Sequence, residues 1–199
     1  MHVPSSVRLA AFSLVLALAV PVATASAQET TFAEPAPVSR PLYVGGGLGV
    51  SAGFNGGALF KLQEEIGYQF DPIYLGTVDM VMRVGGDFAQ QFGDNVTLLQ
   101  FGARFTASFG LWRNEDLGIR IAPSLMLGGA VFITPQICTF GGCFGGDSGA
   151  FNIQFATQAE LELLDGLLTI WFRPIGIDGF IADGSSGRWD ILAGVDVHI

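Results

Sequence analysis

Charged residues, histidine and cysteine are all scarce in this chain of 199 residues. Only 14% of the residues are charged, against about 25% in typical soluble domains, and the mean hydropathy is +0.48. The chain has nine lysine and arginine residues but eighteen aspartate and glutamate residues. This excess of acidic residues argues against a basic patch for nucleic acid or anionic lipid head groups. Yet no stretch after residue 27 has the roughly 20 apolar residues of a membrane-spanning helix. The apolar residues must therefore be spread along the chain in a pattern other than a membrane-spanning helix.

The first 27 residues have the layout of a secretory signal peptide. Arg8 supplies the positive charge, 9–22 is a short apolar run, and 25–27 (ASA) is the small-residue pattern of a cleavage site. A transmembrane helix is the alternative, which the short run and Pro21 disfavour. We therefore expect an exported protein that begins at Gln28, with eight basic against eighteen acidic residues and a net charge of −10 (8 − 18).

The two cysteines, Cys138 and Cys143, lie close together in the segment ICTFGGCFGG. In an exported protein such a pair predicts a disulfide within a loop. A metal site would need more ligands than two thiols, and no histidine is near in the sequence. We expect neither a metal nor a cofactor.

The segment 28–41 is polar and proline-rich and is interpreted as a flexible lead-in. From 42 to 199 strand-like runs alternate with turn signals, and no helical period persists. We therefore predict one all-β domain over 42–199. Its eight expected strands are 42–52, 58–70, 74–88, 96–112, 117–133, 150–164, 167–180 and 188–199.

The alternation of apolar and polar side chains is clearest in 96–112 and 188–199. Successive side chains of a strand point to opposite faces, so each segment has one apolar and one polar face. In the last strand Trp189 and Ile199 share the apolar face, whereas Asp190 and Asp196 lie on the other. Such a strand must pair with an earlier one, most simply by closing an up-and-down antiparallel barrel.

The connections between these strands alternate in length, which is typical of outer-membrane barrels with short periplasmic turns and longer outer loops. The pattern predicts that both termini are periplasmic. The short connections are 71–73, 113–116 and 165–166, and the longer ones are 53–57, 89–95, 134–149 and 181–187.

A lipocalin-type barrel is also exported and eight-stranded, but it turns its apolar face inward around a ligand. Here the polar faces are poor in charge and rich in small residues, which suits a crowded interior better than a water-facing surface. Tyr43, Tyr68 and Tyr74 fall at the predicted periplasmic ends, where an aromatic belt is expected. We therefore favour lipid outside and polar groups inside.

The signal peptide, the eight alternating strands and the two-sided terminal strand resemble the small OmpA/OmpX-like outer-membrane β-barrels of Gram-negative bacteria. The resemblance covers about 42–199 and implies an integral outer-membrane barrel without the peptidoglycan-binding domain of OmpA itself. Such families usually end on an aromatic residue that aids recognition by the assembly machinery. Ile199 departs from that pattern.

The predicted inward faces carry charges that are tolerable inside a barrel only when paired. We interpret them as a salt-bridge network that fills the lumen, with a narrow pore as the alternative. These residues are Lys61, Glu65, Asp79, Arg83, Asp87, Arg104, Arg120, Glu160, Glu162, Arg173, Asp190 and Asp196.

Some small barrels that resemble this one are lipid-modifying enzymes whose histidine, serine and acid lie near the outer leaflet. After the signal peptide this chain has a single histidine, His198, at the predicted periplasmic end. It cannot reach a serine near the outer leaflet, so we expect no enzyme.

The sequence therefore favours a structural or surface-interaction role through outward loops. The longest loop, 134–149, offers Phe140 and Phe144 as candidate contacts for an unknown extracellular ligand. The expected partners are outer-membrane lipids and that ligand, without nucleic acid. A small pore or passage for small or apolar molecules, and an exported lipocalin-like binding protein, are the alternatives.

Overall fold

The computed structural model describes residues 40–54, 57–93, 95–114, 117–135, 137–139, 142–144, 146–182 and 186–199, and only the backbone of 137–139 and 142–144. The predicted signal peptide and most of the predicted lead-in, up to residue 39, lie outside the described residues. In the described part of the chain, no helix is long and apolar enough to cross a membrane.

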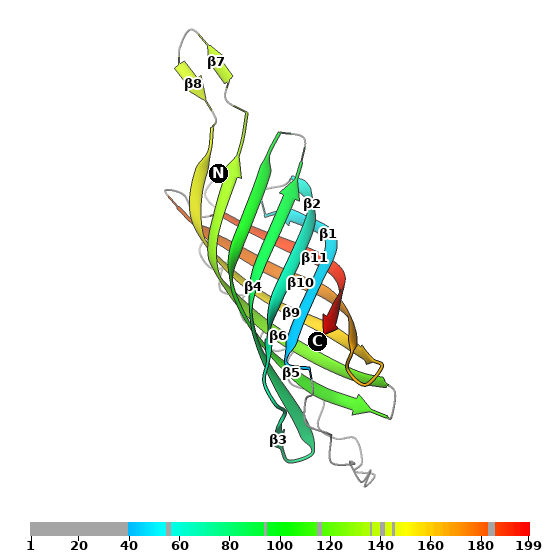
Figure 1. Ribbon diagram of the computed structural model, residues 1–199. Helices are drawn as coiled ribbons and strands as arrows, with labels where there is room; N and C mark the ends of the chain where they lie inside the picture. Colours follow the sequence, from blue (N-terminus) through cyan, green and yellow to red (C-terminus); the bar gives the residue numbers. More distant parts are fainter. Residues whose placement is uncertain are drawn as a thin grey trace, which may run out of the picture. The chain divides into compact units, whose positions relative to one another are not determined.

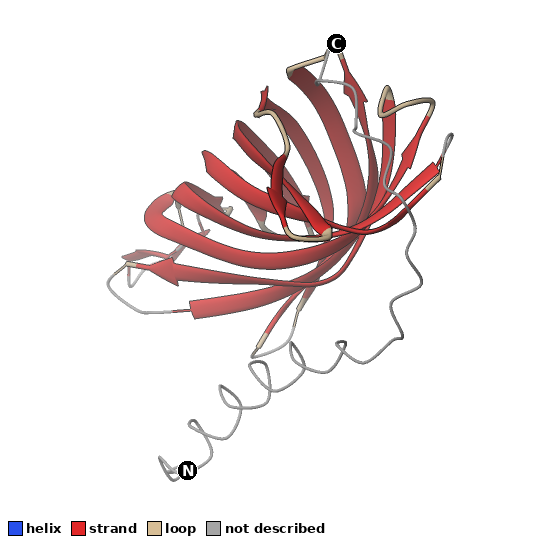
Figure 2. Cartoon of the chain, turned by 90° about the horizontal axis from the view of Figure 1, so that it is seen from below, coloured by secondary structure: helices blue, strands red, loops and turns tan. Residues whose placement is uncertain are grey.

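Eight long strands form one closed antiparallel barrel, in which each strand pairs with its neighbours in the chain (Figures 1 and 2). The pairing of β2 with β4 joins the two ends of the strand order and closes the barrel. The predicted all-β, eight-stranded, up-and-down barrel is confirmed. The strands are β1 (Leu42–Gly53), β2 (Ala58–Gln69), β4 (Val78–Phe92), β5 (Thr97–Arg113), β6 (Leu117–Ile133), β9 (Ser148–Leu163), β10 (Leu168–Ile181) and β11 (Ser186–His198).

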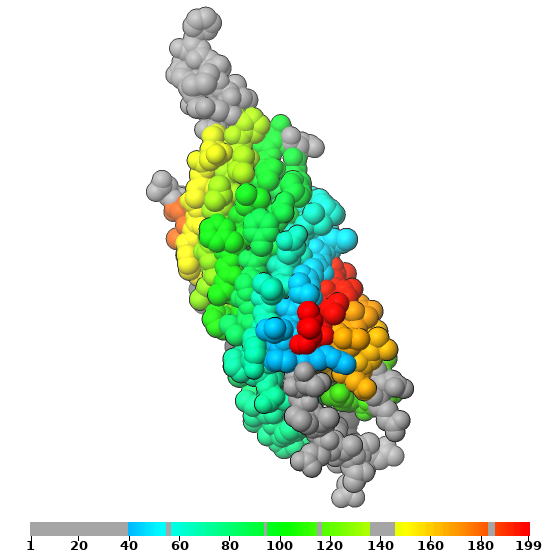
Figure 3. Space-filling model, in the orientation of Figure 1, coloured from blue at the N-terminus to red at the C-terminus, as the bar shows by residue number. Residues whose placement is uncertain are grey.

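The terminal strand β11 lies beside β1, with Tyr43 opposite His198 and Gly53 opposite Arg188 (Figure 3). Ile199 donates a backbone hydrogen bond to Leu42 (2.7 Å) and accepts one from it (3.2 Å). We call the end of the barrel that holds Leu42 and Ile199 the terminal end, and the other the hairpin end. From the hairpin end the chain continues into the two-stranded sheet of β7 (Ile137–Thr139) and β8 (Gly142–Phe144).

The third strand was predicted four residues too early. The strand β4 runs over Val78–Phe92, and the short β3 (Ile73–Leu75) pairs back onto its first residues. Gly76 has a positive φ of 67°, which glycine adopts without strain and which allows the tight turn between β3 and β4. The connection 70–77 at the terminal end is therefore longer than 93–96 at the hairpin end, so the predicted alternation of connection lengths is wrong at these two places.

Large apolar side chains point outward around the barrel, and polar side chains point inward. Phe101 is 52% exposed and Phe105 is 49% exposed, whereas Arg104 between them is 2% exposed. One of the three tyrosines differs from the expectation. Tyr43 is 1% exposed and points into the barrel, because position 43 shares the inward face of β1, whereas Tyr68 and Tyr74 are exposed on the outside.

Candidate functional site

The interior of the barrel holds the one large assembly of polar side chains among the described residues, and we take it as the candidate site. All twelve charged residues that were expected to point inward are buried or half-buried there. They form layers that follow one another from the hairpin end to the terminal end.

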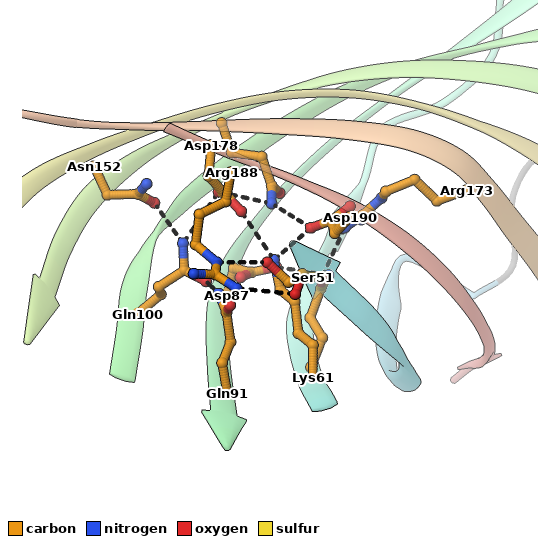
Figure 4. A network of polar contacts seen from close by, with 12 residues as sticks. Ser51, Lys61, Asp87, Gln91, Gln100, Asn152, Arg173, Asp178, Arg188 and Asp190 are labelled. Atoms are coloured by element: carbon orange, nitrogen blue, oxygen red, sulfur yellow. Dashed lines mark hydrogen bonds and ion pairs between the residues drawn. The ribbon is translucent and has the colours of Figure 1, made fainter. Parts of the chain in front are cut away.

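The layer nearest the hairpin end is centred on Lys61 of β2 (Figure 4). Its Nζ contacts Asp190 Oδ2 of β11 and lies 3.3 Å from Asp178 Oδ2 of β10. Gln154 of β9 donates to Asp178 Oδ1 (2.9 Å) and to Asp190 Oδ2 (3.1 Å). Gln100 of β5 donates to Asp178 Oδ1 (3.0 Å) and accepts from Gln91 of β4. One connected set of hydrogen bonds thus joins β2, β4, β5, β9, β10 and β11.

The next layer is centred on Arg104 of β5. Its guanidinium donates to Asp87 Oδ2 (2.8 Å) of β4, Ser124 Oγ (3.1 Å) of β6 and Gln154 Oε1 (2.7 Å) of β9. A fourth partner, Glu65 of β2, lies 3.5 Å away. Because all five donors of a guanidinium point outward in one plane, a single arginine can connect strands on opposite sides of the interior.

A third layer surrounds Arg83 of β4, which pairs with Glu160 of β9 and lies 3.6 Å from Asp196 of β11. Trp171 donates its indole N–H to Asp196 Oδ1 (2.9 Å). Tyr43 donates to Glu65 Oε1 (2.5 Å), so its inward-pointing hydroxyl has a partner in the interior.

At the terminal end Arg120 of β6 pairs with Asp79 of β4 and, at 3.5 Å, with Glu162 of β9. Arg120 Nε also donates to Ser108 Oγ (2.8 Å). His198 is 4% exposed, and its Nε2 lies 3.1 Å from Thr169 Oγ1.

Arg173 of β10 is fully buried but takes part in no ion pair with a described residue. It donates to Gln63 Oε1 (2.8 Å) and, more weakly, to Gln158 Oε1 (3.4 Å), and it lies over the Trp171 ring (5.4 Å). The structure therefore brings Arg173 into the polar interior without an ion pair to a described carboxylate.

Asp178 was missed by the sequence analysis, although it is central to the layer around Lys61. The reason is a β-bulge, since the register of β10 shifts between Phe172 and Ile175 against β9 and between Arg173 and Gly176 against β11. A bulge inserts an extra residue and reverses the faces that follow it. Pro174 within the strand was the available signal, because proline is found in strands mainly at edges and bulges.

At the hairpin end the interior is apolar. Leu59, Leu98, Ala130 and Phe180 are buried together, and Phe132 packs edge-on against Phe180 with the ring centroids 5.2 Å apart. These side chains cover the layer around Lys61. Nearby, Arg188 donates to Ser51 Oγ (2.9 Å) and to the Ser51 and Gly57 carbonyl oxygens.

Three of the four predicted loop residues lie in the short β7–β8 sheet, of which the backbone is described. Cys138 and Cys143 are register partners in the β7–β8 pair, Phe144 ends β8, and Phe140 is outside the described residues. Within the described residues, no group of three or more His, Cys, Asp or Glu side chains is placed to hold a metal ion.

Neither a protein-family model nor a curated protein matches the sequence. Among solved structures, Neisserial surface protein A (NspA) is similar with a TM-score of 0.52 and 9% identity, covering 82% of this chain and 99% of that one. The outer membrane enzyme PagL is similar with a TM-score of 0.51 and 14% identity, covering 79% of this chain and 99% of that one. At such identities the likeness shows the fold alone. The chain has the fold of the small eight-stranded outer-membrane β-barrels.

Proposed function

We propose that this protein is an integral outer-membrane barrel with a filled interior, which acts as a structural or surface-interaction protein through the loops of its hairpin end. The membrane location is supported by the outward face, where Phe101 and Phe105 of β5, Phe155 of β9 and Phe172 of β10 are each 49–61% exposed. A water-facing barrel would carry charges at such positions, whereas a lipid-facing one carries apolar side chains.

The filled interior is the main support for a structural or surface-interaction role and against a pore. Lys61, Arg104, Arg83 and Arg120 each pair with carboxylates inside the barrel, and apolar side chains cover this network at the hairpin end. An ion could pass only by breaking several buried, charge-assisted contacts. The inward polar face also opposes the lipocalin-like alternative, which needs an apolar interior.

The proposed orientation of the barrel in the membrane rests on the differences between its terminal end and its hairpin end. The exposed Tyr68 and Tyr74 lie toward the terminal end, and the β7–β8 hairpin extends the longest connection at the other end. In outer-membrane barrels the longer loops face outward. We therefore place both termini in the periplasm and the β7–β8 hairpin outside the cell.

We also propose that the barrel is not an enzyme. The fold does not decide this, because PagL is an outer membrane enzyme with a similar barrel. The support comes from His198, whose ring is buried beside Thr169 at the terminal end and so is not available to a substrate at the outer leaflet.

Conductance in planar bilayers tests the proposed role. The purified, folded protein should give no steady single-channel steps. Reproducible steps that disappear in Arg104→Ala or Glu160→Ala would overturn the filled interior and favour the pore.

A second test concerns the loop. Deleting 138–144 should abolish partner binding on whole cells, while the barrel still folds and shows heat-modifiable mobility. Release of the protein by a carbonate wash would contradict the membrane location.

A further inference from the structure

Glu64 is a carboxylate on the outer face of the barrel. It lies in the middle of β2 and is exposed, as are its outward neighbours Leu62 and Ile66. Tyr68 lies four positions further along the strand, which is about 13 Å along the strand and about 10 Å along the barrel axis for a tilt of about 40°. If Tyr68 lies at the membrane surface, Glu64 lies within the apolar band, which is about 25 Å tall. Ionisable groups at such depth are costly and mark functional sites.

Among the described residues, Glu64 has no compensating partner. No hydrogen bond or ion pair reaches it from the residues that the structure describes. The other exposed charged residues in the described part of the chain are Asp71, Arg113, Asp147 and Asp165, all at strand ends or in connections. A filled lumen does not explain Glu64, because its neighbours Gln63 and Glu65 point inward and it does not.

The carboxylate borders a groove of about 680 Å³ on the outer face of β1, β2, β4 and β5. Val44, Ile66, Phe88 and Phe101 form its apolar walls. Gly86 lies at its floor and has open space where a side chain would be, and Phe88 is the register partner of Glu64 on β4.

We infer that this groove binds an amphiphilic cation, a molecule with one ammonium group and an apolar body, from within the membrane. The carboxylate would pair with the ammonium, the phenylalanine rings could add cation–π contacts, and the apolar walls would take the chain. An uncharged lipid chain would leave Glu64 unpaired. A second copy of the barrel would also leave it unpaired, because among the described residues the exposed cation is Arg113, at the end of β5.

The test uses the folded protein in phosphatidylcholine nanodiscs with hexadecylammonium as the probe, because its N–H groups, which choline head groups lack, can donate to the carboxylate. Titration should saturably perturb the backbone amide resonances of Ile66, which lines the groove, and of Gly46, the register partner of Glu64 on β1. Two variants should weaken binding about tenfold or more. Glu64→Gln removes the negative charge, and Gly86→Leu fills the floor of the groove but keeps that charge. Asp71→Asn is the matched control, since it removes an exposed carboxylate at the terminal end and should bind like wild type.

Each other outcome overturns the inference. Absence of saturable shifts in the wild type, or equal shifts with hexadecanol, would show that no cation site exists. Equal weakening in Asp71→Asn and Glu64→Gln would show general attraction to a negative barrel. Unchanged binding in Gly86→Leu would place the probe outside the groove. Heat-modifiable mobility of each variant establishes that the barrel is folded.

Discussion

Lys61 on β2 and Asp190 on β11 form a buried ion pair across β1, the strand between them. The contact is possible because the residue of β1 that pairs with Lys61 is Gly49. The inward positions 45 and 47 are also glycines, and a side chain there would overlap Asp196 and Trp171 respectively. In this part of the interior β1 contributes backbone alone, and the side chains of its neighbours occupy the space.

The first prediction concerns the space over the inward-facing glycines of β1. Gly47→Val should destabilise the barrel by about 1–3 kcal/mol or more, because a Cβ at position 47 would lie 2.3 Å from Trp171 Cη2. Gly86→Val is the matched control, since nothing lies within 4 Å of a Cβ there. Urea-induced unfolding in lipid vesicles measures both free energies. Equal effects of the two substitutions would contradict the close packing over β1.

The second prediction concerns the charge of Lys61. Lys61→Met keeps most of the side-chain volume but leaves Asp178 and Asp190 without their shared cation. The expected loss is about 3–5 kcal/mol of unfolding free energy, as for other buried pairs that lose one partner.

The matched control is again Asp71→Asn, an exposed charge whose removal should change the unfolding free energy by less than about 0.5 kcal/mol. The double variant Lys61→Met/Asp190→Asn should recover part of the loss, because one of the two unpaired carboxylates is gone. If the double variant were less stable than Lys61→Met alone, the unpaired charge would not be the cause.

Much of this architecture could be predicted from the alternation of apolar and polar residues, because a barrel with an apolar outer face and a polar inner face imposes a period of two on every strand. The inward set was predictable wherever the strand is regular, as around Arg104. The prediction of inward residues failed where the alternation of faces is interrupted. Arg173 and Asp178 are five residues apart and both point inward, which a regular strand forbids. Tyr43 shows the other limit, since its place at a predicted periplasmic strand end suggested a belt residue, but its side chain lies on the inward face of β1 and its hydroxyl donates to Glu65.

The third prediction tests the bulge. Deletion of Ile175 would restore a regular β10, so that Asp178 and Phe180 would point outward and their contacts with Lys61 and Leu98 would be lost. We expect such a chain to fail to fold, as read from the absence of heat-modifiable mobility. Pro174→Val keeps the chain length and should still fold. If the deletion variant folded with wild-type stability, the extra residue would not set the register.

The fourth prediction concerns the cysteines. Cys138 and Cys143 are register partners in the β7–β8 pair, and facing residues in antiparallel pairs have Cα atoms about 4.5–5.5 Å apart, within the range that a disulfide spans. Protein isolated from cells without reductant should therefore resist alkylation by iodoacetamide, and reduction should expose two thiols to it, as measured by mass spectrometry. The double variant Cys138→Ser/Cys143→Ser should keep the unfolding free energy of the barrel, because the bond closes only a local loop beyond β6 and β9. Alkylation of both cysteines before reduction would disprove the disulfide, and a large loss of barrel stability in the double variant would show that the hairpin supports the barrel itself.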